Sequence, residues 1–125
     1  MPRGKKKDPR EILIETIIQA MMDKKAKKPV VLDFARLNGM ICDNFVLCHG
    51  TSRTHVEAVA GKVMDEVKKT TGINPWHKEG FENAEWILID YNDVVVHIFQ
   101  EERRKFYNLE QLWADAEITQ VEVQE

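Results

Sequence analysis

Two short apolar segments separated by a three-residue turn restrict the fold of this chain more than any other feature. Residues 86–90 read WILID, residues 94–99 read VVVHIF, and residues 91–93 between them read YND. Segments of this length, rich in β-branched and aromatic residues and joined by so tight a turn, predict an antiparallel hairpin. The second segment is apolar on both faces, so we expect a central strand that is covered above and below.

The N-terminal part of the chain carries a strong helix-start signal. Asp8, Pro9 and Glu11 supply an N-cap acceptor, a proline in the first turn and the carboxylate of a capping box. Apolar residues then recur at helical spacing: Ile14, Ile17, Ile18 and Met21. This pattern predicts a helix over residues 9–27, which Pro29 would end.

The remaining segments complete an alternating order of elements. Residues 30–34 and 44–49 read as strands, and residues 50–52 (GTS) break the second one and cap a helix that ends near Gly72. A helical start at residues 101–107 and an apolar face around residues 109–113 predict a C-terminal helix. The strand–helix–strand crossover favours a parallel pair. We therefore expect an α/β fold, a mixed sheet with helices on both faces.

The length and the charge distribution suggest one domain with two dissimilar ends. The chain has 125 residues and a net charge of −3, yet residues 1–28 hold nine Lys and Arg against four acids. We expect a basic flexible arm over residues 1–8, a single domain over 9–113, and an acidic, partly mobile tail over 114–125. The acidic body favours a basic protein as partner. No apolar run is long enough to span a membrane and no signal peptide is recognisable, which predicts a cytoplasmic protein.

The strand-to-helix turn at Gly50, Thr51 and Ser52 is a candidate phosphate site. Backbone amides at a helix N-terminus can hold a phosphate, but the motif is much shorter than a known phosphate-binding loop, so a capped turn is favoured. A nucleotidyltransferase would also need two carboxylates one residue apart on the next strand to bind its metal ions. On this strand the residue two positions before Asp90 is Leu88, which is not a carboxylate. The fold therefore allows a transferase, whereas the catalytic carboxylates are missing.

Four potential metal ligands lie within fourteen residues: Cys42, Cys48, His49 and His55. Cys48 and His49 are neighbours on a predicted strand and point to opposite faces, which disfavours a zinc site and a nucleophile–base pair alike. We expect reduced thiols, no metal and no cofactor. His97, on an apolar strand, is expected to be a core histidine with one satisfied nitrogen rather than a general base.

The hairpin itself offers a candidate binding patch. Trp86 at its start and Asp90, Tyr91, Asn92 and Asp93 at its turn combine aromatic and acidic side chains, as protein interfaces often do. The alternative is that Trp86 fills the core and the acids accept hydrogen bonds from turn amides. Composition alone supports the two interpretations equally.

Three stretches of the chain together resemble the ribosomal silencing factor family, also called Iojap-like. The first is residues 79–99. The second is residues 43–56, which include His49 and the turn Gly50 to Ser52. The third is residues 107–113, which read YxLExLW and follow Arg104. The resemblance covers roughly residues 10–113. Asn92 stands where the family usually has glycine, and asparagine also tolerates positive φ.

The resemblance implies a nucleotidyltransferase-like fold without catalytic carboxylates, and a protein that is not an enzyme. It implies binding to the large ribosomal subunit through its ribosomal protein fourteen, so that the small subunit cannot join and translation is repressed under starvation. The docking residues would be Trp86, Leu88, Asp90, Tyr91, Asn92 and Asp93. A homodimer of the free protein, a nucleotide-binding transferase and a nucleic-acid binder that uses the basic arm remain alternatives.

Overall fold

The computed structural model describes residues 8–37, 39–40 and 42–122. Its elements, in chain order, are α1 (Pro9–Asp23), β1 (Lys27–Asp33), β2 (Asn44–Gly50), α2 (Arg53–Thr71), β3 (His77–Glu79), β4 (Trp86–Asp90), β5 (Val94–Gln100), α3 (Glu101–Tyr107), α4 (Leu109–Leu112) and β6 (Glu117–Gln120).

The strands form one mixed sheet with the order β3-β4-β5-β2-β1-β6. The predicted hairpin is confirmed: β4 and β5 are antiparallel, with Trp86 opposite Phe99. β5 is central, and six of its seven residues are buried, as its apolar pattern predicted. The parallel pair expected from the crossover is β2 with β5, the second strand of the hairpin, and β4 lies beyond it.

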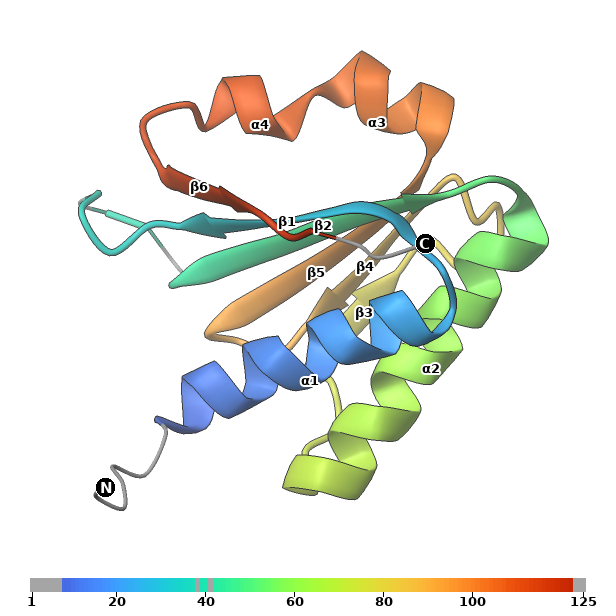
Figure 1. Ribbon diagram of the computed structural model, residues 1–125, viewed down its shortest axis with the longest axis horizontal. Helices are drawn as coiled ribbons and strands as arrows, with labels where there is room; N and C mark the ends of the chain where they lie inside the picture. The colour runs from blue at the N-terminus through green and yellow to red at the C-terminus, as the bar shows by residue number, and fades with distance from the viewer. Residues whose placement is uncertain (1–7, 38, 41, 123–125) are drawn as a thin grey trace.

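Helices cover both faces of the sheet, which confirms the predicted fold class. Figure 1 shows α1 and α2 together on one side and α3 and α4 on the other. Each layer has its own apolar cluster, because the side chains of a strand alternate between the two faces. On β5, for example, Val96 and Ile98 face α1 and α2, whereas Val95 and Phe99 belong to the opposite cluster. No helix in the described part of the chain is long and apolar enough to cross a membrane.

The first helix starts as predicted but ends earlier. The capping box of Asp8 and Glu11 is present, and Arg10 N–H donates to Asp8. The predicted end at residue 27 is wrong: α1 ends at Asp23, and Lys25 takes a positive φ of 59°. Ala26 is buried, and its N–H donates to the Met21 carbonyl, so the chain turns back into the sheet before Pro29 is reached. Core packing of one alanine thus outweighs the helical propensity of the lysines.

The acidic tail contains a strand, β6, that its sequence pattern does not predict. Residues 117–120 pair with β1, from Glu117 opposite Asp33 to Gln120 opposite Val30. All four residues of β6 are exposed, so the strand carries no apolar alternation that would reveal it. It covers what would otherwise be the free edge of β1. The sheet therefore extends past residue 113, while the boundaries of arm, domain and tail stay predictions, and residues 1–7 of the arm lie outside the described residues.

Candidate docking surface

The alternation along β4 separates the predicted site residues into two groups. Trp86 and Leu88 are half-buried and pack against the cluster beneath α3 and α4, and Asp90 follows them on the same face. Ile87 and Ile89 point to the other face and are fully buried. β4 therefore presents one aromatic, one aliphatic and one acidic side chain on a single, partly open face.

Trp86 is held in place by three neighbours. Its indole Nε1–H donates to Nδ1 of His97 at 3.0 Å. Its ring stacks on Phe99 at 5.0 Å and packs against Tyr107 at 4.6 Å between ring centroids. Trp86 thus packs at the rim of the core, as one of the two interpretations expected, and keeps part of its surface exposed in one fixed orientation. Its docking role stays a prediction.

The loop before β4 also needs a glycine at residue 80. Gly80 has a φ of +89°, and a Cβ atom there would lie 2.0 Å from the backbone carbonyl oxygen of Trp86. Only glycine allows this backbone approach. Gly80, one of the residues of the family resemblance, therefore helps to place the start of β4.

His97 is the core histidine that the sequence predicted. It is 3% exposed, Nδ1 accepts the Trp86 hydrogen bond, and Nε2 has no partner. Burial lowers the pKa of His97 from 6.5 to about 3. The ring is therefore neutral, and because Nδ1 accepts, the proton is assigned to Nε2.

This buried histidine predicts a loss of stability in mild acid. Between pH 6.5 and about pH 3 the unfolded chain binds a proton at residue 97 that the folded protein does not bind, so the free energy of unfolding falls as the pH falls. We expect the parent protein to lose about 2 kcal/mol more between about pH 7 and pH 5 than the His97→Gln variant, which keeps an acceptor for Trp86. Urea unfolding at the two pH values measures this. Equal losses in the two proteins would show that His97 is not buried in its neutral form.

The turn of the hairpin is built as the alternative interpretation foresaw. The Asp90 carboxylate accepts the Asn92 N–H at 2.7 Å, and Asn92 has the positive φ, 77°, that the sequence allowed it. Asn92 and Asp93 are exposed. Asp90 therefore stabilises the turn, and this role fixes where its charge lies.

The acids at this end of the sheet create a common negative field. Burial and then the charges of Asp90, Asp43 and Asp93 raise the pKa of the Cys42 thiol to about 11. Asp43 lies 3.5 Å from the Arg10 guanidinium, whereas no cation of the described residues lies within ion-pair distance of Asp90 or Asp93. A basic partner would therefore be attracted to this end of the molecule.

Tyr91 is set apart from the other predicted docking residues. It is 7% exposed, packs in the cluster beneath α1 and α2, and its hydroxyl has no partner. Burial raises the pKa of Tyr91 to about 12. We therefore define the hairpin surface as Trp86, Leu88, Asp90, Asn92 and Asp93, and leave Tyr91 out.

The candidate phosphate site is a capped turn. Ser52 Oγ accepts the His55 N–H at 3.1 Å and so caps α2. The Thr51 N–H donates to Nδ1 of His55 at 3.0 Å, and the other ring nitrogen of His55 lies 2.7 Å from the Lys24 carbonyl oxygen. A backbone amide that a phosphate would need is thus already used within the chain.

The cysteines and histidines do not form a metal site in the described part of the chain. No group of three or more His, Cys, Asp or Glu residues there is arranged to hold a metal ion. Cys48 packs beneath α1 and α2, and His49 lies on the opposite face beside Arg104, as their positions on a strand predicted. Burial raises the pKa of Cys48 to about 12, so its thiol is unreactive.

Arg104 has a structural role that the sequence analysis missed. It is 8% exposed, and its Nη1 lies 2.8 Å and 3.3 Å from the carbonyl oxygens of Lys28 and Lys27 and 3.0 Å from Nδ1 of His49. Its Nη2 donates to Glu110 at 3.0 Å. Burial and then the Arg104 charge lower the pKa of His49. The Arg104 side chain thus connects α3 to β1, β2 and α4 through hydrogen bonds. No local pattern in the sequence indicates this role.

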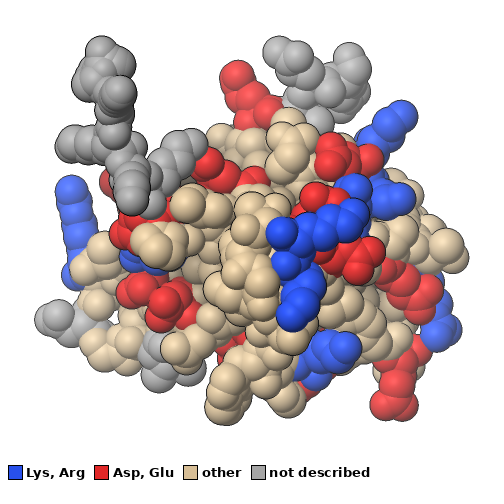
Figure 2. Space-filling model, turned by 90° about the horizontal axis from the view of Figure 1, so that it is seen from below, with Lys and Arg blue, Asp and Glu red and all other residues tan. Residues whose placement is uncertain are grey.

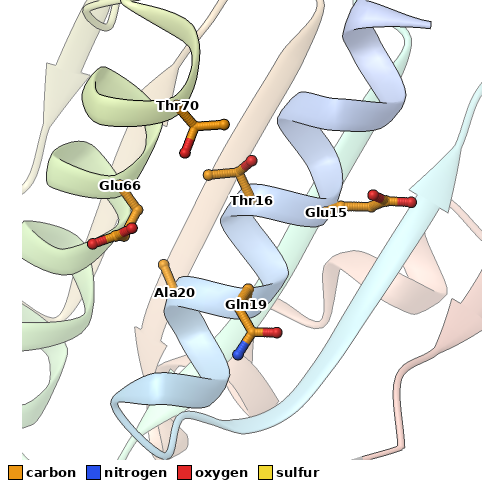
Figure 3. Close-up of a pocket in the computed structure, with 6 residues that line it drawn as sticks. All are labelled: Glu15, Thr16, Gln19, Ala20, Glu66 and Thr70. Carbon is orange, nitrogen blue, oxygen red and sulfur yellow. The ribbon is translucent and has the colours of Figure 1, made fainter. Parts of the chain in front are cut away.

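A pocket of about 300 Å³ lies between α1 and α2. Figure 3 shows the residues that line it: Glu15, Thr16, Gln19, Ala20, Glu66 and Thr70. The Glu15 side chain points away from α2, and Glu66 lies 3.2 Å from Lys62 and 3.7 Å from Lys69. The two carboxylates do not converge, so this pocket does not resemble an acid–base site.

Comparison with known proteins agrees with the resemblance. The family described as "Ribosomal silencing factor during starvation" matches residues 6–125. The "Ribosomal silencing factor RsfS" of Halalkalibacterium halodurans is 41% identical over 110 residues, 88% of this chain and 92% of that protein. A crystal structure of a protein from Chromobacterium violaceum superposes with a TM-score of 0.78 at 32% identity, covering 83% of this chain and 85% of that one. The mouse "Mitochondrial assembly of ribosomal large subunit protein 1" is 33% identical over 73 residues, 57% of this chain and 32% of that protein.

Proposed function

This chain belongs to the ribosomal silencing factor family, and from that premise we propose that it represses translation by binding the large ribosomal subunit and blocking the small one. The contact on the large subunit is its ribosomal protein fourteen. The family name supports a ribosomal target, and the name of the mouse relative refers to the large subunit.

The hairpin surface is the observation that carries this proposal. Trp86 is a partly exposed aromatic side chain fixed by His97, Phe99 and Tyr107, so little side-chain entropy is lost when it binds. Rigid, partly buried tryptophans are frequent hot spots of protein interfaces. Asp90 and Asp93 add negative charge at the other end of β4, roughly 13 Å from Trp86 along the strand, which suits a basic ribosomal protein.

Silencing of this kind needs no chemistry. The protein acts by occupying a surface that the small subunit must reach, so affinity and position decide the effect. Asp90 is the only carboxylate on β4, which has no second metal-binding carboxylate of a nucleotidyltransferase. We therefore propose that the protein is a non-enzymatic factor that acts in the cytoplasm in association with ribosomes. A homodimer that used the hairpin surface would compete with docking.

Neutral variants of the two turn acids test the electrostatic part of the proposal. Asp90→Asn keeps an oxygen that can accept the Asn92 N–H, so the double variant Asp90→Asn/Asp93→Asn changes charge with little change in the turn. We expect association with ribosomal protein fourteen to slow by about threefold or more at low salt, and to depend less on salt. Stopped-flow or biosensor kinetics measure both quantities.

The matched control is Asp115→Asn/Glu117→Gln. It removes the same charge from exposed residues at the β6 edge, on the far side of the sheet from β4. Its association rate should stay close to that of the parent. Equal slowing of both variants would mean that net charge, and not the hairpin surface, determines the rate.

A further inference from the structure

Four lysines surround the turn between α1 and β1. We call Lys24, Lys25, Lys27 and Lys28 the lysine turn; all four are exposed, and Ala26 between them is buried. None of the four has a described carboxylate within ion-pair distance. Seven of the ten other described Lys and Arg residues do have one, and the remaining three, Arg36, Lys68 and Lys78, are scattered along the chain; the seven are Arg10, Arg53, Lys62, Lys69, Arg103, Arg104 and Lys105.

The contrast extends to the surface around the turn. Figure 2 shows the molecule from below, the side on which Figure 1 places α1 and α2, and acidic and basic side chains are interspersed over this face. The electric fields of interspersed opposite charges cancel within a short distance of the surface. The lysine turn instead concentrates four uncompensated positive charges within five residues.

The backbone of the lysine turn is fixed from within. His55 Nε2 lies 2.7 Å from the Lys24 carbonyl oxygen, and Arg104 lies within hydrogen-bond distance of the Lys27 and Lys28 carbonyl oxygens. Lys25 and Lys28 have positive φ values of 59° and 48°, which are unfavourable for lysine and persist only where the surroundings impose them. The charges are thus presented from a rigid support, which reduces the ordering cost of binding.

The lysine turn and the acidic hairpin turn lie at opposite ends of the sheet. Lys27 pairs with His49, which pairs with Phe99, near the end of β5. Asp90 pairs with Val95, near its start. The four residue steps from Val95 to Phe99 separate the two turns by roughly 13 Å along the strand direction, and the three strand spacings from β4 to β1 add a total of roughly 14 Å across the sheet. Trp86, which pairs with Phe99, lies level with the lysine turn along the strands, and only the three strand spacings separate these two. A partner bound along β4 therefore leaves the lysine turn, three strands away on β1, free to meet a second surface.

We infer that the lysine turn binds the phosphodiester backbone of ribosomal RNA. This inference rests on the proposed function for the position of the protein, because a large subunit presents basic proteins and anionic RNA side by side. A basic protein would repel the lysine turn, whereas RNA phosphates match its compact, uncompensated charge. Lysine ammonium groups are point charges that position a protein on a backbone without reading bases, so the contact is independent of RNA sequence. The protein thus docks with two surfaces of opposite charge.

The test compares two variants of the full chain that lose the same number of charges. The first is Lys24→Gln/Lys25→Gln/Lys27→Gln/Lys28→Gln. The control is Lys62→Gln/Lys68→Gln/Lys69→Gln/Lys105→Gln, which changes lysines on α2 and α3. Binding of each protein to protein-free large-subunit RNA and, separately, to purified ribosomal protein fourteen is measured over a series of salt concentrations, and thermal unfolding confirms that both variants are folded.

For the lysine-turn variant we expect affinity for RNA to fall about tenfold or more, and the slope of log K against log salt to decrease by about 2 to 4. The control should bind RNA like the parent, and all three proteins should bind ribosomal protein fourteen alike. Equal losses in both variants, no RNA binding by the parent, or lost binding of the lysine-turn variant to ribosomal protein fourteen would each overturn the inference. If the parent binds RNA through the lysine turn but does not bind ribosomal protein fourteen, the proposed contact fails while the RNA contact stands.

Discussion

Replacement of Trp86 by alanine is expected to weaken binding to the large ribosomal subunit by about 2 kcal/mol or more, which is about a 30-fold rise in Kd. The physical reason is that Trp86 combines a partly exposed ring with a fixed orientation, given by His97 and Phe99. Alanine removes the contact area and leaves a cavity at the rim of the core. Equilibrium binding of the labelled protein to purified large subunits measures the change.

Two comparisons separate docking from damage to the fold. Urea unfolding establishes the temperature and conditions at which Trp86→Ala is fully folded, and binding is measured there. Ile118→Ala is the matched apolar control, because Ile118 is exposed on β6, at the other edge of the sheet. It should bind like the parent. A folded Trp86→Ala protein with unchanged Kd would remove this residue from the interface.

The largest effect on stability is expected from Arg104→Ala, about 3 to 5 kcal/mol of the free energy of unfolding. The substitution leaves Glu110 without its cation and takes the hydrogen-bond donor from His49 and from the carbonyl oxygens of Lys27 and Lys28. Buried polar atoms without partners are costly. Chemical denaturation should show a much lower midpoint with a similar dependence on denaturant.

The neighbouring residue supplies a stringent control. Arg103 forms an ion pair with Glu85 at 3.3 Å, but its side chain is 44% exposed, compared with 9% for Arg104. Arg103→Ala should therefore cost no more than about 1 kcal/mol. Similar losses for the two variants would mean that burial of Arg104 does not determine its contribution.

The elements that could be predicted are those with a local cause. Four such features each depend on a few adjacent residues, and the structure confirms them: the hairpin, the capping box at Asp8, the N-cap at Ser52 and the left-handed C-cap at Gly72. The central position of β5 also followed from its own composition, because a strand that is apolar on both faces must be covered on both.

The features that could not be predicted depend on contacts between distant segments. Arg104 meets residues that lie 55 to 77 positions away in the sequence, and β6 gains its strand conformation from β1. Tyr91 illustrates the same limit at the candidate site, since only packing beneath α1 and α2 determines to which side a turn residue points. For Trp86 the sequence left two roles open: the structure shows its packing at the rim of the core, and its docking role stays a proposal.

The most direct test of the account is sedimentation of the purified protein with separated ribosomal subunits, followed by addition of the missing subunit. We predict that the protein migrates with the large subunit and not with the small one, and that fewer joined ribosomes form in its presence. Protein that stays at the top of the gradient while the subunits join normally would contradict ribosome silencing by this chain.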